Sequence, residues 1–472
     1  MLDWIKNRLP FKERQRHSQT GSKGVKQTST KISVTVADAS TLGIDARRIS
    51  DNALRVMQRL NDAGHEAYIV GGGVRDLLLD MRPKDFDIAT SATPEQVRQV
   101  FRNSRIIGRR FRIVHVLFGR ETIEVTTFRG HHSNAEDARD GESTDTGLLV
   151  RDNVYGSLEE DALRRDFTVN ALYYCVDSKV RDYCNGLTDI QKRQIRMIGE
   201  PELRYREDPV RMLRAVRLAA KLGFTLEKQT GQPIARLAHL LNDISNARLF
   251  DEMLKLFMAG AALKTFELML DHHLFAVLFP GPARLYAPGN YSDHLIRQAL
   301  ANTDERIRNN QRVTPAFLYA AILWPTVQHQ ITHAEAEGLP PYQALQRAAQ
   351  KVITEQVKRI GIPKRFSVPM QEIWEMQFQL DRRQGGRAER LLEQARFRAA
   401  YDFLLLREHA GEFLNGLGQW WTDYQAADTE TRLQMVKQLQ PPAGKNGQRR
   451  RRNNRNRRGA GRQGAQRSPT ED

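Results

Sequence analysis

Three consecutive glycines separate a strand-like run from a helical run, and this junction most constrains what the chain can fold into. Residues 67–70 (AYIV) favour a strand, Gly71, Gly72 and Gly73 follow, and residues 74–79 have the spacing of a short helix. Glycines allow a backbone to approach a ligand closely, and the first N–H groups of a helix are available to phosphate. The pattern is neither GxGxxG nor a Walker loop, so it predicts neither a dinucleotide site nor a P-loop. Alone, it fits a tight turn without a ligand equally well.

Asp85 and Asp87 lie at the start of the next strand-like run, 86–89. Residues i and i+2 of a strand point to the same face, so the two carboxylates are predicted to project together. Two adjacent like charges are costly unless a cation neutralises them, and carboxylates are good ligands for Mg²⁺. Two metal ions held there would activate an attacking hydroxyl and stabilise a leaving pyrophosphate. An isolated DxD is more often a solvated strand end, but the glycine turn just upstream favours the metal site.

Two further segments carry charged side chains in suggestive patterns. In the run RRDFTVNA, Arg165 precedes Asp166, and an arginine beside a carboxylate can bind phosphate or orient catalytic groups. The alternative is a structural salt bridge at a helix start.

In DPVRMLRAVR, Asp208 is a good N-cap, and Arg211, Arg214 and Arg217 fall within an arc of roughly 120° on a helix. Such an arginine stripe is usually a solvated surface, but it also suits a base edge with a triphosphate beyond it.

The net charge is +17, from 73 Lys and Arg against 56 Asp and Glu, which favours a polyanionic partner. Residues 441–472 contain ten basic and two acidic residues and so supply +8 of this charge. This arginine-rich tail cannot build a core, and we expect it to stay disordered until RNA binds. The alternative is a tail that only improves solubility.

The composition also excludes several classes of protein. The two cysteines, Cys175 and Cys184, cannot form a disulfide framework, and no run of ~18 apolar residues would span a membrane. The N-terminus lacks the apolar core of a secretion signal. It fits a flexible arm or a short amphipathic helix that touches a membrane surface or a partner. These features favour a reducing, cytoplasmic location.

The order of the elements predicts an α+β fold, with a small mixed sheet and helices first and an all-helical part after it. Strands are expected at 113–118 and 121–128, a helix at 44–60 and a long loop at 131–152. Helical spacing dominates from 205 to 440, interrupted by loops at 280–288, 338–341 and 382–386.

The segments VGGGVRDLLLDMRPKDFD, RRDFTVNALYY and REDPVRMLRAVRLAAKLGF together resemble the class II nucleotidyltransferases. That family contains tRNA CCA-adding enzymes and bacterial poly(A) polymerases. The resemblance covers about residues 50–260 and extends more loosely to about 425. It departs from the family at Asp80, where glycine is usual, which puts the local turn in doubt.

The resemblance implies a layout of domains and a set of site residues. The domains are a flexible basic arm (1–43), a nucleotidyltransferase head (44–195), a neck with a nucleotide-reading helix (196–260), a helical RNA-binding body (261–440) and a disordered tail (441–472). Asp85 and Asp87 are expected to bind Mg²⁺, and Asp166 to belong to the catalytic site. The nucleotide is expected to contact Gly72, Arg75 and Arg165 through its phosphates or sugar, and Asp208, Arg211, Arg214 and Arg217 on the reading helix.

Residues 106–116 (IIGRRFRIVHV) resemble a stretch that marks the bacterial poly(A) polymerases within the family. This similarity implies that ATP is the substrate, RNA 3′ ends the acceptors, and RNA turnover the role, with RNA-degradation machinery as an expected partner. A CCA-adding enzyme and a non-catalytic RNA-binding relic are the alternatives. Glu124 is a candidate third carboxylate ranked below Asp166, because a strand glutamate more often faces solvent. His115 is interpreted as a strand residue and not as a zinc ligand.

Overall fold

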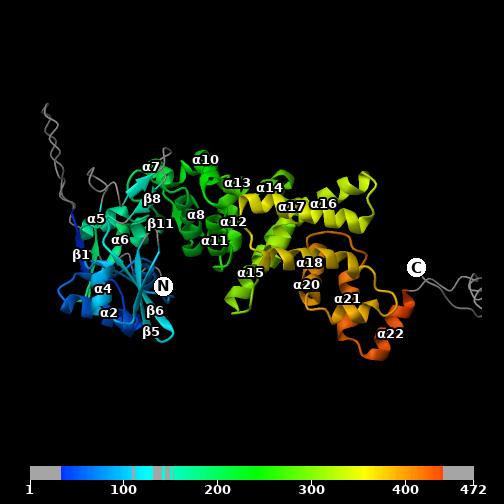
Figure 1. The fold of residues 1–472 in the computed structure, drawn as a ribbon, viewed down its shortest axis with the longest axis horizontal. Helices are drawn as coiled ribbons and strands as arrows, with labels where there is room; N and C mark the ends of the chain where they lie inside the picture. Colours follow the sequence, from blue (N-terminus) through cyan, green and yellow to red (C-terminus); the bar gives the residue numbers. More distant parts are fainter. Residues whose placement is uncertain (1–32, 109–111, 131–140, 144–148, 153, 440–472) are drawn as a thin grey trace, which may run out of the picture. The chain divides into compact units, whose positions relative to one another are not determined.

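The computed structural model describes residues 33–108, 112–130, 141–143, 149–152 and 154–439. The chain forms two compact units, Met1–Met370 and Gln371–Asp472 (Figure 1). The boundary falls inside helix α18 (Lys364–Leu380), so the single body predicted for 261–440 is divided between the units. The predicted tail and most of the predicted arm lie outside the described residues.

An eight-stranded mixed sheet forms the centre of the head, as the α+β fold class predicts. All neighbours in it are antiparallel except β3 and β6, which run parallel. The spatial order is β1 (Thr35–Asp38), β10 (Lys179–Asp182), β9 (Leu172–Tyr174), β2 (Ala67–Val70), β3 (Asp87–Thr90), β6 (Glu121–Thr127), β5 (Ile113–Phe118) and β4 (Ser104–Ile107).

Strand β1 corrects the prediction that residues 1–43 are a flexible arm, because residues 35–38 pair with β10 at the edge of the sheet. The arm is polar on average, but the run SVTVAD contains three consecutive β-branched residues and favours a strand. A second correction concerns the loop predicted at 131–152, where β7 (Gly141–Ser143) pairs antiparallel with β8 (Leu149–Asp152).

Helices pack on both faces of this sheet. On one face, α2 (Asp51–Asp62) and α4 (Pro94–Val100) pack against Ile88, Val114 and Val125, each at most 1% exposed. On the other face, α5 (Leu158–Arg164) packs over β2, β3 and β9. The helix predicted at 44–60 begins only at Asp51, because Ser50 caps it, and a short 3-10 turn, η1 (Ala46–Arg48), precedes it.

The neck follows the sheet in the chain and is mostly helical. Two short strands, β11 (Gln194–Ile195) and β12 (Thr225–Leu226), pair in parallel within it. The remaining elements of the head and neck are α3 (Gly72–Leu78), η3 (Thr168–Asn170), α6 (Gly186–Gln191), α7 (Pro201–Glu207), α8 (Val210–Leu222), α9 (Lys228–Gly231), α10 (Ile234–Leu237), η4 (Ala238–Asp243) and α11 (Asn246–Phe257).

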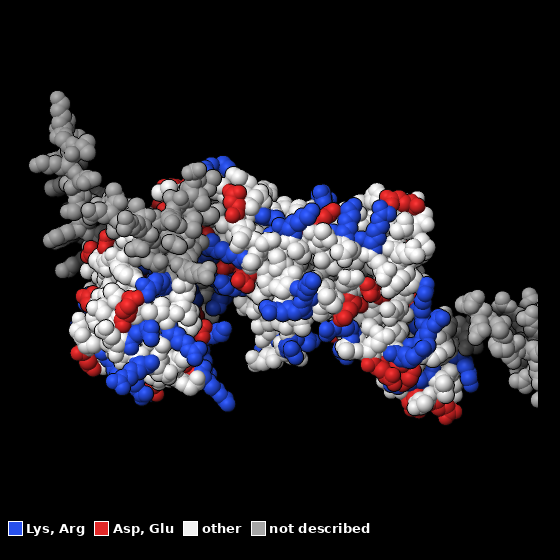
Figure 2. All heavy atoms as spheres, in the orientation of Figure 1, with Lys and Arg blue, Asp and Glu red and all other residues white. Residues whose placement is uncertain are grey.

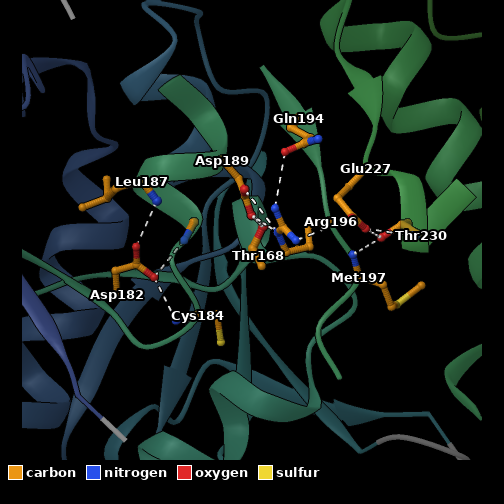
Figure 3. A network of polar contacts seen from close by, with 11 residues as sticks. Thr168, Asp182, Cys184, Leu187, Asp189, Gln194, Arg196, Met197, Glu227 and Thr230 are labelled. Carbon is orange, nitrogen blue, oxygen red and sulfur yellow. Dashed lines mark hydrogen bonds and ion pairs between the residues drawn. The ribbon is translucent and has the colours of Figure 1, made fainter. Parts of the chain in front are cut away.

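A network of polar contacts joins the head to the neck (Figure 3). Buried Asp189 accepts hydrogen bonds from Oγ1 of Thr168 at 2.7 Å and from Nε of Arg196 at 3.1 Å. Nη1 of Arg196 lies 3.7 Å from Glu227, whose carboxylate accepts a bond from Oγ1 of Thr230. Buried charged networks of this kind fix one arrangement of the segments they join when every member is paired. The network therefore connects the segment that follows Asp166 to β11 and β12, the strands that precede and follow α8 in the chain.

The rest of the first unit consists of α12 (Ala262–Asp271), α13 (Leu274–Leu278), α14 (Pro280–Leu285), α15 (Tyr291–Arg308), α16 (Pro315–Ala336) and α17 (Pro341–Arg359). Helix α14 lies where a loop was predicted, because Pro280 occupies the first helical position, which needs no N–H. The loops predicted at 338–341 and 382–386 are confirmed between helices.

The second unit contains α19 (Arg387–Leu392), α20 (Phe397–His409), α21 (Leu417–Ala426) and α22 (Thr429–Gln438), packed around Trp421. Among the residues that the structure describes, no helix is long and apolar enough to cross a membrane.

Candidate active site

The glycine turn connects β2 directly to α3, as the sequence predicts. Gly71 has a φ of 78°, a conformation that favours glycine, and Gly72 is the first residue of the helix. A side-chain carbon at Gly73 would lie 3.0 Å from the ring of Phe86, so close packing requires glycine there as well. The turn therefore lies tightly against the segment that carries Asp85 and Asp87.

Asp87 is the first residue of β3 and is paired in register with Val70 on one side and Glu124 on the other. Asp85 is exposed and precedes the strand, so the prediction that both carboxylates lie on the strand is wrong. Burial raises the pKa of Asp87 to about 6, and the charges of Glu124 and Asp85 add to this rise, while Arg165 opposes it. Asp87 is therefore a partly buried carboxylate whose negative neighbours, Glu124 and Asp85, outweigh the one arginine that opposes them.

Arg165 lies on the other side of Asp87, beside the glycine turn. A side-chain carbon at Gly71 would be 3.8 Å from Oδ2 of Asp87 and 3.9 Å from Nη1 of Arg165. Buried Asp161 holds this guanidinium through bonds of 3.1 and 3.0 Å, and the hydroxyl of Tyr173 accepts a third bond of 2.9 Å. Arg165 is therefore fixed in place with Nη1 directed at the turn, which suits a phosphate.

Asp166 points away from this cluster and pairs with the neck. Its Oδ2 accepts bonds from Nε and Nη2 of Arg214 at 2.8 and 2.5 Å, and its Oδ1 accepts one from Asn170 at 3.2 Å. Burial opposes the charge of Asp166, but the charge and hydrogen bonds of Arg214 outweigh it and hold the pKa below its ordinary value. The structure therefore does not bring Asp166 into a carboxylate cluster with Asp87.

A small cavity of about 70 Å³ lies between the head and α8. It is lined by Arg75, Asp166, Phe167, Asn170, Arg214, Arg217, Leu218 and Lys221. Arg75 is buried and bonds to Asp76 and to Asn170. Nε of Arg217 is buried without a hydrogen-bond partner among the described residues, so a donor is available to a ligand in this cavity. A larger cavity of about 160 Å³, between α16 and α17, contains none of the predicted site residues.

The three arginines of α8 have different partners, although the sequence predicted one stripe. Arg214 and Arg217 line the cavity, whereas Nη1 of Arg211 donates to Glu207 and to the carbonyl of Arg204, both at 2.8 Å. The predicted N-cap position of Asp208 is wrong, because Pro209 is the N-cap of α8 and Asp208 ends α7; one oxygen of Asp208 accepts a bond of 3.3 Å from the N–H of Val210. Its other oxygen accepts a bond of 2.7 Å from Nη2 of Arg248, on α11.

Three family models match the chain. Residues 67–196 match "Poly A polymerase head domain", residues 223–285 "Probable RNA and SrmB- binding site of polymerase A", and residues 337–458 "Polymerase A arginine-rich C-terminus". The chain is 50% identical over 413 residues to poly(A) polymerase I of Salmonella typhimurium, a match that covers 86% of this chain and 89% of that one. It is 44% identical over 412 residues to poly(A) polymerase I of Haemophilus influenzae, covering 86% of this chain and 91% of that one. The chain belongs to the bacterial poly(A) polymerase family.

CCA-adding enzymes are more distant relatives of this poly(A) polymerase family member. The enzyme of Lactobacillus gasseri is 44% identical over 219 residues, which cover 46% of this chain and 53% of the enzyme. Among solved structures, the CCA-adding enzyme of Bacillus stearothermophilus in complex with CTP matches with a TM-score of 0.52 and 27% identity, over 83% of this chain and 88% of that one. The predicted nucleotidyltransferase head with a helical neck and body is thus confirmed as a fold.

Sequence reasoning missed several residues that hold the poly(A) polymerase site together. The contact of Asp161 with Arg165 could have been predicted, because the two residues have the i, i+4 spacing of a helical ion pair. The contact of Arg248 with Asp208 could not, because 40 residues separate them in the chain. The position of Glu124 beside Asp87 was also not predicted, since the pairing of β6 with β3 is a long-range contact that its own sequence does not reveal.

Proposed function

We propose that this chain is a template-independent polynucleotide adenylyltransferase, which adds AMP from ATP to RNA 3′ ends and releases pyrophosphate. The observation that carries the proposal is the position of Asp87, between Glu124 and the glycine turn, with its pKa raised to about 6. Perturbed carboxylates beside a phosphate-binding turn are typical of phosphoryl-transfer sites. Membership of the poly(A) polymerase family supports ATP as the nucleotide.

Asp85 and Asp87 are the proposed ligands of Mg²⁺, with Glu124 as the adjacent third carboxylate. No cluster of three or more metal-binding side chains is found among the described residues, and Mg²⁺ needs none, because it usually combines one or two carboxylates with substrate phosphates. The all-oxygen donor set and the excess negative charge around Asp87 fit this ion. When bound, Mg²⁺ would lower the pKa of the attacking hydroxyl and neutralise charge on the leaving group.

The remaining residues bind and orient the nucleotide. In this proposal the N–H of Gly72 and the guanidinium of Arg165 hold the phosphates beside Asp87. Arg75, Arg214 and Arg217 line the cavity that takes the sugar or base, while Asp166 holds Arg214 in position.

Asp208 and Arg211 complete the nucleotide-reading surface, each held by its own ion pair. Catalysis is then mainly positioning and charge stabilisation.

The reaction in this proposal is an in-line displacement. The 3′-oxygen of RNA forms a bond to the α-phosphorus of ATP, the bond from that phosphorus to the bridging oxygen breaks, and pyrophosphate leaves. Asp87 and Glu124 lie where the hydroxyl is deprotonated, and Arg165 lies on the side of the leaving phosphates.

RNA is the acceptor in this proposal, and a protein of the RNA-degradation machinery is a proposed partner. The match of residues 223–285 to a family model described as a probable RNA and SrmB-binding site supports both. The net charge of +17 supports sequence-independent binding to the RNA backbone.

CCA addition is the second candidate, favoured by the 44% identity over 219 residues to a CCA-adding enzyme. The deciding experiment supplies labelled ATP or CTP and Mg²⁺ with either a generic RNA or a tRNA that lacks its CCA end. Long A ladders on both RNAs are expected. Products that stop after three nucleotides on the tRNA would establish CCA addition, and no product with either RNA would establish a non-catalytic RNA-binding protein.

A further inference from the structure

A row of polar side chains crosses the head sheet, starting at Asp87 and leading away from the glycine turn. Asp87 pairs with Glu124 on β6, Glu124 with His115 on β5, and His115 with Arg105 on β4. Residues directly opposite each other on neighbouring strands project to the same face of a sheet. The four side chains therefore lie side by side on one face.

This part of the face is open to solvent among the residues that the structure describes. The side chain of Glu124 is 48% exposed and that of His115 27%, while Arg105 is exposed and Ile107, two residues along β4, is 39% exposed. The other face of the same strands is buried under α2 and α4. The cover that α5 provides lies over β2, β3 and β9, on the far side of Asp87.

The proposed reaction itself determines which side of Asp87 the RNA occupies. Gly72 and Arg165 hold the phosphates in that proposal, and both lie at the Gly71 turn, on the β2 side of Asp87. In an in-line displacement the attacking and leaving oxygens lie on opposite sides of the phosphorus. The RNA 3′-hydroxyl must then approach from the β6 side, where the row of polar side chains begins.

We propose that Glu124, His115 and Arg105 form the binding site for the 3′-terminal nucleotides of the RNA acceptor. This inference rests on the proposed function and adds where the acceptor strand lies. The negative charge of Glu124, at the Asp87 end of the row, suits a hydroxyl that is to lose its proton. The positive charge of Arg105, at the β4 end, suits a phosphate. Two strand spacings of about 4.8 Å separate β4 from β6, so the backbone of Arg105 lies roughly 10 Å from that of Glu124, a span on the scale of the terminal nucleotides.

The side chain of Arg105 has hydrogen-bonding groups to spare, whereas the free ring nitrogen of His115 is buried. Arg105 forms no side-chain hydrogen bond or ion pair with any residue that the structure describes. Nε2 of His115 lies 3.2 Å from Oε1 of Glu124 but makes no hydrogen bond within the described part of the chain. Arg105 therefore supplies donors for a phosphate, and Ile107 beside it supplies an apolar surface for a base.

A second basic surface lies on the opposite face of the head and serves as the control. Figure 2 shows Lys and Arg side chains gathered over α2 and α4, where Arg55, Arg59 and Arg98 are exposed. Arg98→Gln removes the same charge as Arg105→Gln from the same domain, but on the face away from Asp87. General attraction of RNA to a positive head would weaken equally in both variants.

The experiment measures steady-state adenylation of a tetraribonucleotide by the full-length chain, with variants Arg105→Gln, Arg105→Lys and Arg98→Gln. For Arg105→Gln, KM for the RNA should rise roughly tenfold while KM for ATP stays unchanged, because a charge-assisted phosphate contact is lost. The slope of log affinity against log salt concentration should fall by about 0.7, the value for one single-strand phosphate. Arg105→Lys should recover most of the affinity.

Arg98→Gln should leave both KM values and the salt slope unchanged. Equal rises in KM for the RNA in Arg105→Gln and Arg98→Gln, or no rise in either, would overturn the inference while adenylation by the wild-type chain still upholds the proposed function. Absence of adenylation by the wild type would overturn the proposed function first. Circular dichroism of each variant distinguishes lost binding from lost folding.

Discussion

Two aspartates, Asp87 at the start of β3 and Asp166 at the junction of head and neck, have pKa values shifted in opposite directions. Burial and the charges of Glu124 and Asp85 raise the pKa of Asp87 to about 6. Burial acts in the same direction on Asp166, but Arg214 outweighs it and holds that pKa below its ordinary value. The first carboxylate has no arginine bound to it and is the one that the proposed function assigns to a cation, whereas the second is paired with Arg214.

This difference separates a binding role from a positioning role. An uncompensated carboxylate costs stability in the absence of a ligand and is typical of functional sites. A carboxylate with bonds of 2.8 and 2.5 Å to one arginine keeps both side chains in one arrangement. We therefore expect changes at Asp87 to abolish chemistry and changes at Asp166 to act through the position of Arg214.

The largest effect is expected for Asp87→Ala. Loss of a metal ligand should lower kcat for AMP incorporation by about a thousandfold or more, which corresponds to about 4 kcal/mol of barrier. The measurement is single-turnover extension of labelled RNA with saturating ATP. Asp62→Ala, at the exposed end of α2, is the matched control and should retain full activity. Near-normal activity in well-folded Asp87→Ala would refute the metal assignment.

The second effect concerns the pair of Asp166 and Arg214. Arg214→Gln leaves Asp166, whose side chain is 12% exposed, charged and without its main partner, and should lower the free energy of unfolding by about 3 kcal/mol. The double variant Asp166→Asn with Arg214→Gln should lose less than the sum of the single variants, as urea unfolding would measure. The exposed pair Arg347 and Glu337 is the control, where Arg347→Gln should cost about 0.5 kcal/mol or less. Strictly additive losses would show that the two residues do not act together.

The sequence predicts those parts of the fold that depend on residues close together in the chain. Strands 67–70 and 113–118 were predicted with their observed bounds because β-branched and aromatic residues fill them. The three-residue strand β9, which pairs with both β10 and β2, is too short to show a period.

The same contrast holds within the site. The glycine turn precedes Asp87 by a short stretch of chain, and this spacing predicted that the two lie close together. It did not predict that Asp85 lies before the strand. Glu124 meets Asp87 only through the parallel pairing of β3 with β6, and no local pattern reveals the bonds between Asp166 and Arg214. Register and tertiary pairing are long-range properties, which one sequence leaves undetermined.

A third aspartate, Asp208, is paired like Asp166 and extends the comparison to nucleotide choice. Asp208 accepts a bond of 2.7 Å from Arg248, which should hold its carboxylate in one position for reading the base. Arg248→Gln should therefore reduce the ratio of kcat/KM for ATP to that for CTP about tenfold, or about 1.4 kcal/mol. Arg236→Gln, which removes a neck arginine from an exposed ion pair with Glu202, is the control and should leave the ratio unchanged. Equal ratios in wild type and Arg248→Gln would remove Asp208 from nucleotide selection.

The smallest expected effect is a change in folding stability and needs no measurement of catalysis. It tests whether Asp87 lacks a partner that neutralises its charge. A carboxyl whose pKa is raised in the folded state contributes stability that is fully present below its unfolded pKa, near 4, and is lost as the pH rises through about 6. Asp87→Asn never acquires the charge, so at pH 7.5 without Mg²⁺ it should be more stable than the wild type by about 1 kcal/mol, after allowance for solvent screening. Denaturant unfolding of both proteins should show this gain shrink to nothing near pH 4. Millimolar Mg²⁺ should stabilise the wild type alone, since the ion binds the folded carboxylate. A variant that is less stable than the wild type at pH 7.5 would mean that Asp87, like Asp166, is already neutralised within the protein.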